Sequence, residues 1–178
     1  MKLLPLMVET SKKDGEGRII NVSSEGHKMG SQKIMFNDVF MEKEEVYEPF
    51  KSYGQSKLAN IMFSNELNRR MEDLNIPIFV NSLHPGVIAT ELGRDMGYNE
   101  TLMSVVMGIG SIFMKSIPQG AATSVYGCVH SDLKGKGGLY LHDCNISESI
   151  PYSKDKDEQK KLFDFSEKVT GVNFPELK

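Results

Sequence analysis

Short apolar runs that alternate with longer helical segments constrain the fold of this chain more than any other feature. Residues 18–23 (RIINVS), 76–83 (IPIFVNSL) and 138–142 (GLYLH) are short, apolar or aromatic, and flanked by Gly or Pro. Such runs are typical of buried strands. Residues 52–73 repeat apolar side chains at helical spacing and lack Gly and Pro after Gly54. Because strands that alternate with helices form parallel sheets covered by helices, the sequence predicts an α/β fold.

The segments between these runs complete the pattern. Residues 25–50 show no regular period and are predicted to form a loop. Further helices are expected at 3–12, from Pro118 to about Val129, and at 157–169, with an apolar helix or lid at 100–116. The chain has no internal repeat and no low-complexity linker, so residues 1–178 are expected to form a single domain.

Composition and charge exclude several classes of protein. The chain has 178 residues, 21 basic and 24 acidic, which argues against an electrostatically driven nucleic-acid binder. Cys128 and Cys144 are too few for a zinc motif or a disulfide framework, and they suit an intracellular reducing compartment, cytoplasmic or at an organelle membrane. No apolar run approaches the ~20 residues of a membrane span. The apolar stretch 3–8 is followed at once by charged residues, so no signal peptide is predicted.

Ser24, Tyr53 and Lys57 are the side chains with the clearest chemical potential. Tyr53 and Lys57 are four residues apart on a predicted helix and therefore share one face. A phenol is a weak base at neutral pH because its reference pKa is ~10, but an ammonium group one turn away favours the phenolate. A hydroxyl at the end of a strand, such as Ser24, could hold a carbonyl oxygen beside that phenol. By spacing alone, however, Tyr-x-x-x-Lys is also common on solvated helix faces.

Three sequence motifs in a fixed order favour the proton-transfer interpretation over a solvated helix face. Residues 17–24 (GRIINVSS), 53–60 (YGQSKLAN) and 81–90 (NSLHPGVIAT) each fall on the element that the pattern needs. Together they strongly resemble the short-chain dehydrogenase/reductase family. The branch that contains retinol dehydrogenases, the WW-domain oxidoreductase and the chloroplast translocon-associated members is the most similar. The resemblance runs from about residue 2 to 170.

The resemblance implies a role for each matching residue. Tyr53 is expected to donate or accept the proton, Ser24 to orient the substrate oxygen, and Lys57 to bind the nicotinamide ribose and favour the phenolate. Residues Pro85, Gly86 and Val87 are expected to line the nicotinamide site, and Thr90 to help close over the cofactor. The implied activity is NAD(P)-dependent interconversion of an alcohol and a carbonyl. The retinol dehydrogenase branch favours NADP over NAD.

Residues 91–118 match the segment that shapes the substrate pocket in this family. Their apolar character fits a small lipophilic alcohol or carbonyl, retinoid-like or steroid-like. The same side chains would also suit a helix that simply packs on the core, and both interpretations stay open. No metal or nucleic-acid partner is expected.

The family's dinucleotide-binding half has no counterpart in this sequence. That half begins with a strand, a Gly-rich turn and a helix that bind the pyrophosphate. Gly15–Ile20 comes close to the motif but precedes a strand, and Gly108–Phe113 lacks the last glycine and a preceding strand. The expected fold is therefore the C-terminal half of a Rossmann-like, doubly wound parallel sheet, a single partial domain with three strands. Its strand at 18–23 would then have an unpaired edge, which predicts a marginal, association-prone fold.

An alternative function follows from that absence. The chain could be a catalytically inactive fragment or an interaction module that cannot bind cofactor alone. The helix at 52–73 commonly forms a dimer interface in the family, so a homodimer or heterodimer through it is possible. A serine hydrolase, suggested by residues 54–58 (GQSKL), lacks the closing glycine and the strand-to-helix turn.

Three further residues are given structural interpretations. His27 and His84 are taken as polar loop residues without paired metal ligands. Cys128 lies beside Val125 and Val129 on a predicted helix and is expected to be buried in the core.

Overall fold

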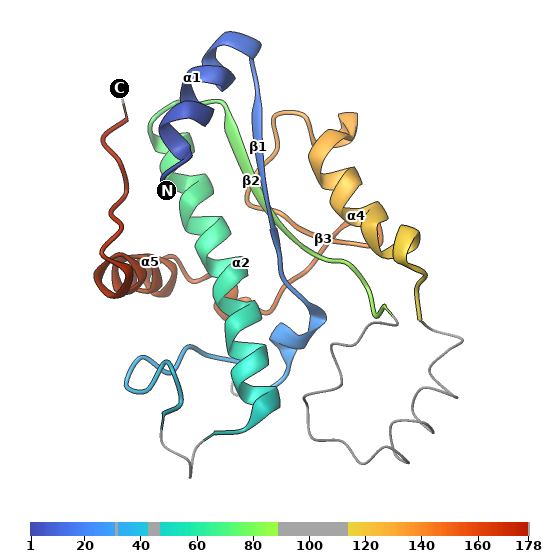
Figure 1. Cartoon of the computed structure of the whole chain (residues 1–178), viewed down its shortest axis with the longest axis vertical. Helices are drawn as coiled ribbons and strands as arrows, with labels where there is room; N and C mark the ends of the chain where they lie inside the picture. Colours follow the sequence, from blue (N-terminus) through green and yellow to red (C-terminus); the bar gives the residue numbers. More distant parts are fainter. Residues whose placement is uncertain (31, 43–46, 89–113, 178) are drawn as a thin grey trace.

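The computed structural model describes residues 1–30, 32–42, 47–88 and 114–177, and its elements follow the predicted alternation of helices and strands (Figure 1). The helices are α1 (Leu4–Asp14), α2 (Pro49–Asp73), α4 (Ile117–Val129) and α5 (Lys156–Thr170). The strands are β1 (Gly17–Val22), β2 (Ile78–His84), β3 (Tyr140–His142) and β4 (Asn145–Ser147). Short 3-10 turns lie at η1 (Glu25–Lys28), η3 (Ser131–Leu133) and η4 (Pro151–Lys154).

The four strands form one sheet in the order β1-β2-β3-β4. Strands β1, β2 and β3 are parallel, with Gly17 beside Ile78 and Ser82 beside Tyr140. Strand β4 turns back and pairs antiparallel with β3. The sequence predicted only three strands, and that count was wrong because β4 is three residues long and carries no apolar run. Within the described residues β1 is an outer strand, as the sequence predicted.

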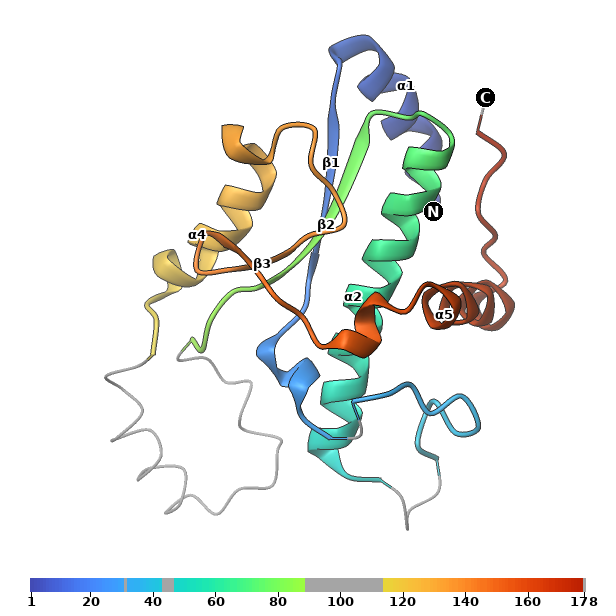
Figure 2. The same ribbon diagram turned by 180° about the vertical axis from the view of Figure 1, so that it is seen from behind.

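Helices cover both faces of this sheet, as in a doubly wound fold. Figures 1 and 2 show α1, α2 and α5 on one side of β1 and β2, and α4 on the other. Helix α2 packs on β2 and also contacts α5. The fold is α/β with a mostly parallel sheet, as predicted. No helix among the described residues is long and apolar enough to cross a lipid bilayer.

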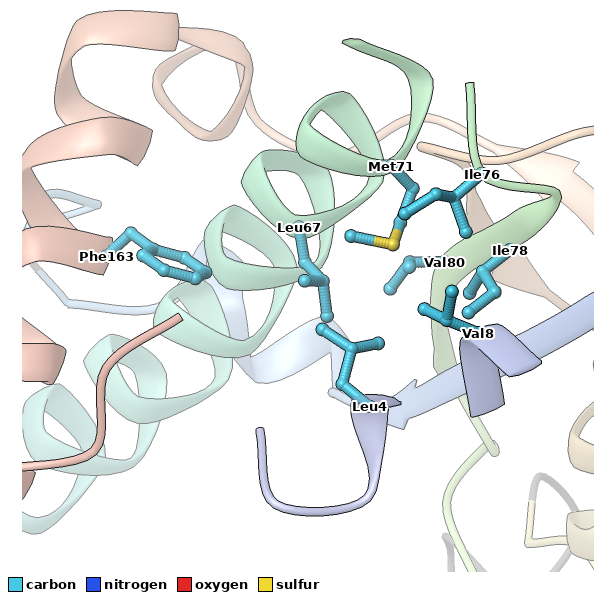
Figure 3. Packing of buried hydrophobic residues seen from close by; sticks show 8 residues of the cluster. All are labelled: Leu4, Val8, Leu67, Met71, Ile76, Ile78, Val80 and Phe163. Atoms are coloured by element: carbon cyan, nitrogen blue, oxygen red, sulfur yellow. The ribbon is translucent and has the colours of Figure 1, made fainter. Parts of the chain in front are cut away.

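The main hydrophobic core lies between α1, α2, α5 and the sheet (Figure 3). Leu67 and Met71 on α2 face Ile78 and Val80 on β2, and none of these side chains is more than 4% exposed. The other buried members are Leu4 and Val8 of α1, Ile76, and Phe163 of α5. Burial of such side chains stabilises the fold by roughly 1.5–3 kcal/mol each. This core fixes α2, and with it Tyr53 and Lys57, against the sheet.

Helix α4 contacts the sheet through small residues. Its buried positions are Gly120, Thr123 and Gly127, and a Cβ at Gly127 would lie 3.1 Å from the Ile20 side chain. The prediction that Cys128 is buried was wrong, because this cysteine is exposed. The small residues bring the helix close to the sheet, and Ile117, Val125 and Val129 of this helix are exposed.

Candidate active site

Two groups of predicted functional residues lie at the carboxyl ends of parallel strands. Ser24 follows β1, and residues 85–87 follow β2. In open α/β sheets this edge is where ligands bind, because the connections that leave the strands there form a crevice. The order of the strands thus places segments that are far apart in the sequence around one site.

A tight turn holds Ser24 in place. Ser24 is the N-cap of η1, and its Oγ accepts a hydrogen bond of 3.0 Å from the Gly26 N–H. Its carbonyl oxygen accepts from the His27 N–H at 3.0 Å and from the His27 ring at 2.6 Å. Because the Gly26 contact uses a lone pair of Oγ, the Ser24 hydroxyl can still donate its own hydrogen to a ligand.

Gly26 brings the Tyr53 ring against this turn. A Cβ at Gly26 would lie 2.5 Å from Tyr53 Cε1 and 3.4 Å from Ser24 Oγ. The ring edge and the Ser24 hydroxyl therefore both pack against Gly26. Gly54 makes a similar close approach, since its Cβ would lie 2.7 Å from the Met29 carbonyl oxygen. Neither glycine was predicted as a site residue, although each lies within or next to one of the three motifs.

Lys57 completes the predicted trio from the next turn of α2. Its Nζ lies 5.3 Å from the centre of the Tyr53 ring, within the range of a cation–π contact. The Lys57 carbonyl oxygen accepts a hydrogen bond of 2.7 Å from Ser23 Oγ, which ties α2 to the end of β1. Ser24, Tyr53 and Lys57 are thus neighbours in space, and their roles in a reaction stay predictions.

A carboxylate beside Ser24 links the turn to β3. Glu25 accepts a hydrogen bond of 3.0 Å from the Tyr140 hydroxyl and forms an ion pair with Lys28 at 2.5 Å. Burial alone would raise the pKa of Glu25, but the bonds from Lys28 and Tyr140 outweigh it and the pKa is lowered. Burial, reinforced by the Glu25 charge, raises the pKa of Tyr140, so this phenol stays a donor. No sequence motif signals this link.

Two histidines near the site are buried rather than exposed in loops. His27 lies in η1 and is fully buried, and His84 is the last residue of β2 and is 6% exposed. Burial lowers the pKa of both, and that of His84 falls to about 4 with a further contribution from the His142 charge. Both rings are therefore neutral near pH 7. Among the described residues no cluster of His, Cys, Asp or Glu could hold a metal ion.

The predicted cofactor-lining residues lie only partly within the described chain. Pro85, Gly86 and Val87 form the loop that leaves β2, with Gly86 at a φ of +99°. Thr90 lies outside the described residues, as does most of the predicted substrate segment 91–118. Gly15 ends α1 and precedes β1, so residues 15–20 do not form the strand–turn–helix of a pyrophosphate site. Residues 108–113 also lie outside the described chain.

Comparisons with known proteins find that the chain is similar to short-chain dehydrogenases. No family model matches it. It is 40% identical over 169 residues to the short-chain dehydrogenase TIC 32 B, chloroplastic, of Brassica napus, covering 94% of this chain and 51% of that protein. It is 36% identical over 170 residues to retinol dehydrogenase 14 of Mus musculus, covering 96% and 49%.

One solved structure supports the fold. An uncharacterized protein from Mycobacterium paratuberculosis superposes with a TM-score of 0.64 over 90% of this chain and 52% of that chain, at 24% identity. The chain spans about half the length of the curated relatives that it matches. Over nearly its whole length, then, this chain is homologous to about half of a short-chain dehydrogenase.

Proposed function

We propose that Ser24, Tyr53 and Lys57 form the proton-transfer site of an NAD(P)-dependent oxidoreductase that interconverts an alcohol and a carbonyl. The observation that carries the proposal is that the Tyr53 ring and Ser24 Oγ both pack against Gly26. Lys57 Nζ lies 5.3 Å from the same ring. The homology to short-chain dehydrogenases supports the same class of activity.

Each of these residues has a defined task in this proposal. The Ser24 hydroxyl donates a hydrogen bond to the substrate oxygen while its Oγ accepts from Gly26. In reduction, the Tyr53 hydroxyl gives its proton to the oxygen of the carbonyl; in oxidation, the phenolate removes the proton of the alcohol. The Lys57 ammonium favours the phenolate through its positive charge. When bound, the reduced cofactor (NADPH or NADH) would supply the hydride to the carbonyl carbon, and the oxidised cofactor (NADP or NAD) would accept it from the alcohol carbon.

The described residues fit one end of such a cofactor. Lys57 and the loop 85–87 lie at the same edge of the sheet, where the nicotinamide and its ribose would bind. The described residues contain no Gly-rich turn between a strand and a helix, so they do not fit the pyrophosphate. We therefore assign the nicotinamide end to this chain. The preference for NADP over NAD rests on the resemblance to retinol dehydrogenases.

The proposed substrate is a small lipophilic alcohol or carbonyl, retinoid-like or steroid-like. The support is the apolar sequence of residues 102–114 and the name of a relative, retinol dehydrogenase 14. A dimer through α2 and a reducing intracellular compartment are proposed on the resemblance and the cysteine count. Nucleic acid is not among the proposed partners because the net charge is −3.

A second candidate is a catalytically inactive fragment or interaction module. One observation favours it: the described residues offer no pyrophosphate turn between a strand and a helix. In this case the site residues would be retained in position without binding cofactor. The two candidates differ in one measurable property, the affinity for the dinucleotide.

Titration of the purified chain with NADPH and NADH, followed by calorimetry, separates the two candidates. Under the first proposal, the chain binds NADPH saturably and Lys57→Ala abolishes binding. Tyr53→Phe should retain most of the affinity, because it removes the proton donor and keeps the ring. No binding of either dinucleotide up to millimolar concentration would reject the enzyme and favour the fragment.

A further inference from the structure

The loop that leaves β2 rests on the side chain of Lys115. A Cβ at Gly86 would lie 2.5 Å from Lys115 Cδ and 3.0 Å from its Nζ, so the loop backbone packs directly on the lysine stem. The Lys115 N–H donates to the Val87 carbonyl oxygen at 2.7 Å, and Ile88 forms a parallel bridge with Lys115. Two segments 27 positions apart in the sequence are thereby joined at the end of the sheet.

The ammonium group of Lys115 connects this loop to β3. It forms an ion pair with Asp143, and it lies 3.5 Å from the Pro85 carbonyl oxygen. The hydrogen bond from Lys115 lowers the pKa of Asp143 and keeps the carboxylate charged. The Lys115 side chain is 24% exposed and that of Asp143 57% exposed. At such exposure the charge attraction alone is weak, so the packed lysine stem supplies much of the constraint.

Asp143 is itself held in an unusual backbone conformation. Asp143 and Cys144 form the two-residue turn between β3 and β4, with φ values of +50° and +56°. Such turns normally use Asn and Gly, because side chains disfavour positive φ. The Cys144 N–H donates to Oγ1 of Thr123, a fully buried residue of α4, at 3.4 Å. The turn is thus fixed by α4 on one side and by Lys115 on the other.

We propose that Lys115 and Asp143 are positioning residues that hold the 85–87 loop in the shape required at the nicotinamide end of the site. This inference rests on the proposed function, because it assigns the loop's purpose to cofactor binding. The turn at Asp143 places its carboxylate, the carboxylate directs Lys115, and Lys115 supports the backbone of Gly86. Neither side chain needs to touch the cofactor.

The first test does not depend on cofactor binding. NMR hydrogen exchange measures how often the Lys115 N–H loses its bond to the Val87 carbonyl. Asp143→Asn and Lys115→Met should each accelerate that exchange about tenfold, because the loop opens locally. Lys160→Met is the matched control, since it removes an exposed ion pair with Asp164 on α5. Unchanged exchange in both site variants would overturn the proposal.

The second test links the loop to the cofactor. Asp143→Asn and Lys115→Met should each weaken NADPH binding about tenfold, whereas Lys115→Arg should keep most of the affinity. A double variant, Lys115→Asp with Asp143→Lys, should recover less than Lys115→Arg because the Gly86 contact needs a long stem. Faster exchange with unchanged NADPH affinity would overturn the positioning role. If the unaltered chain binds no NADPH, the proposed function fails, and exchange alone decides whether the loop is held.

Discussion

Gly26 controls how closely the Tyr53 ring can approach Ser24. Gly26→Ala would place a methyl group 2.5 Å from Tyr53 Cε1, so the ring must move. We expect a loss of about 1–3 kcal/mol in the free energy of unfolding and a loss of NADPH binding. Calorimetry and urea denaturation measure both effects.

The matched control for this change is Gly135→Ala. Gly135 has a φ of +69°, and a methyl group there would have no atom within 4 Å, so this variant strains the backbone without a clash. It should lower stability and leave NADPH affinity intact. If Gly26→Ala binds NADPH as tightly as the unaltered chain, the close packing of Tyr53 is not needed for the site.

The buried His84 predicts a pH dependence of stability. The pKa of His84 is about 4 in the folded chain, below its ordinary value of 6.5. At pH values between these two, the unfolded chain therefore binds a proton that the folded chain does not. Stability therefore falls as the pH falls, by about 2 kcal/mol from pH 7 to pH 5. Urea denaturation of His84→Gln should show a shallower slope in that interval. His130→Gln, at a more exposed ring, is the control, and parallel curves for the unaltered chain and His84→Gln would contradict this reasoning.

At the scale of elements, β1 offers an outer strand edge at which a second copy of the chain can pair. It is an outer strand of the described sheet, and Val22 at its end is 49% exposed. A charged side chain on such a strand opposes edge-to-edge pairing. We expect Val22→Lys to reduce self-association of the purified chain in light scattering without changing its fold. Val169→Lys on α5, at the same 49% exposure, should leave association unchanged, and an equal effect of both variants would show that net charge alone is responsible.

The elements that sequence could predict are those with a strong apolar period. The helix at 52–73 and the strands at 18–23 and 76–83 were found within a few residues of α2, β1 and β2, since burial dictates their side chains. Strand β4 could not be predicted, because its turn uses Asp143 and Cys144 in place of a recognisable Asn-Gly pair. The position of Cys128 was misjudged because Val125, Cys128 and Val129 recur at helical spacing, yet the stripe of small residues is the one that faces the sheet.

At the scale of the site, the motifs predicted which residues lie close together. They did not predict the contacts from other segments that support these residues. Ser24, Tyr53 and Lys57 could be predicted because the three motifs around them occur in a specific order, although the spacing of Tyr53 and Lys57 alone is common. The supports depend on contacts between distant segments, such as Tyr140 with Glu25 across 115 positions of sequence. No local pattern reports such a contact.

For the whole molecule, the central claim is that the described residues carry the proposed nicotinamide end of a dinucleotide site and contain no pyrophosphate cradle. The order of the elements supports that division, because Gly15 ends helix α1 and precedes strand β1. The adenosine and pyrophosphate parts of the cofactor should then add little to affinity. A smaller ligand that keeps only the nicotinamide, ribose and one phosphate should bind nearly as well.

The most direct measurement is a comparison of reduced nicotinamide mononucleotide with NADPH in calorimetric titrations of the same protein. The account predicts that the two affinities agree within about threefold and that Lys57→Ala abolishes both. An affinity for NADPH about a hundredfold higher would reveal a pyrophosphate site and contradict the division. Absence of binding for both ligands would contradict the assignment of the nicotinamide end to this chain.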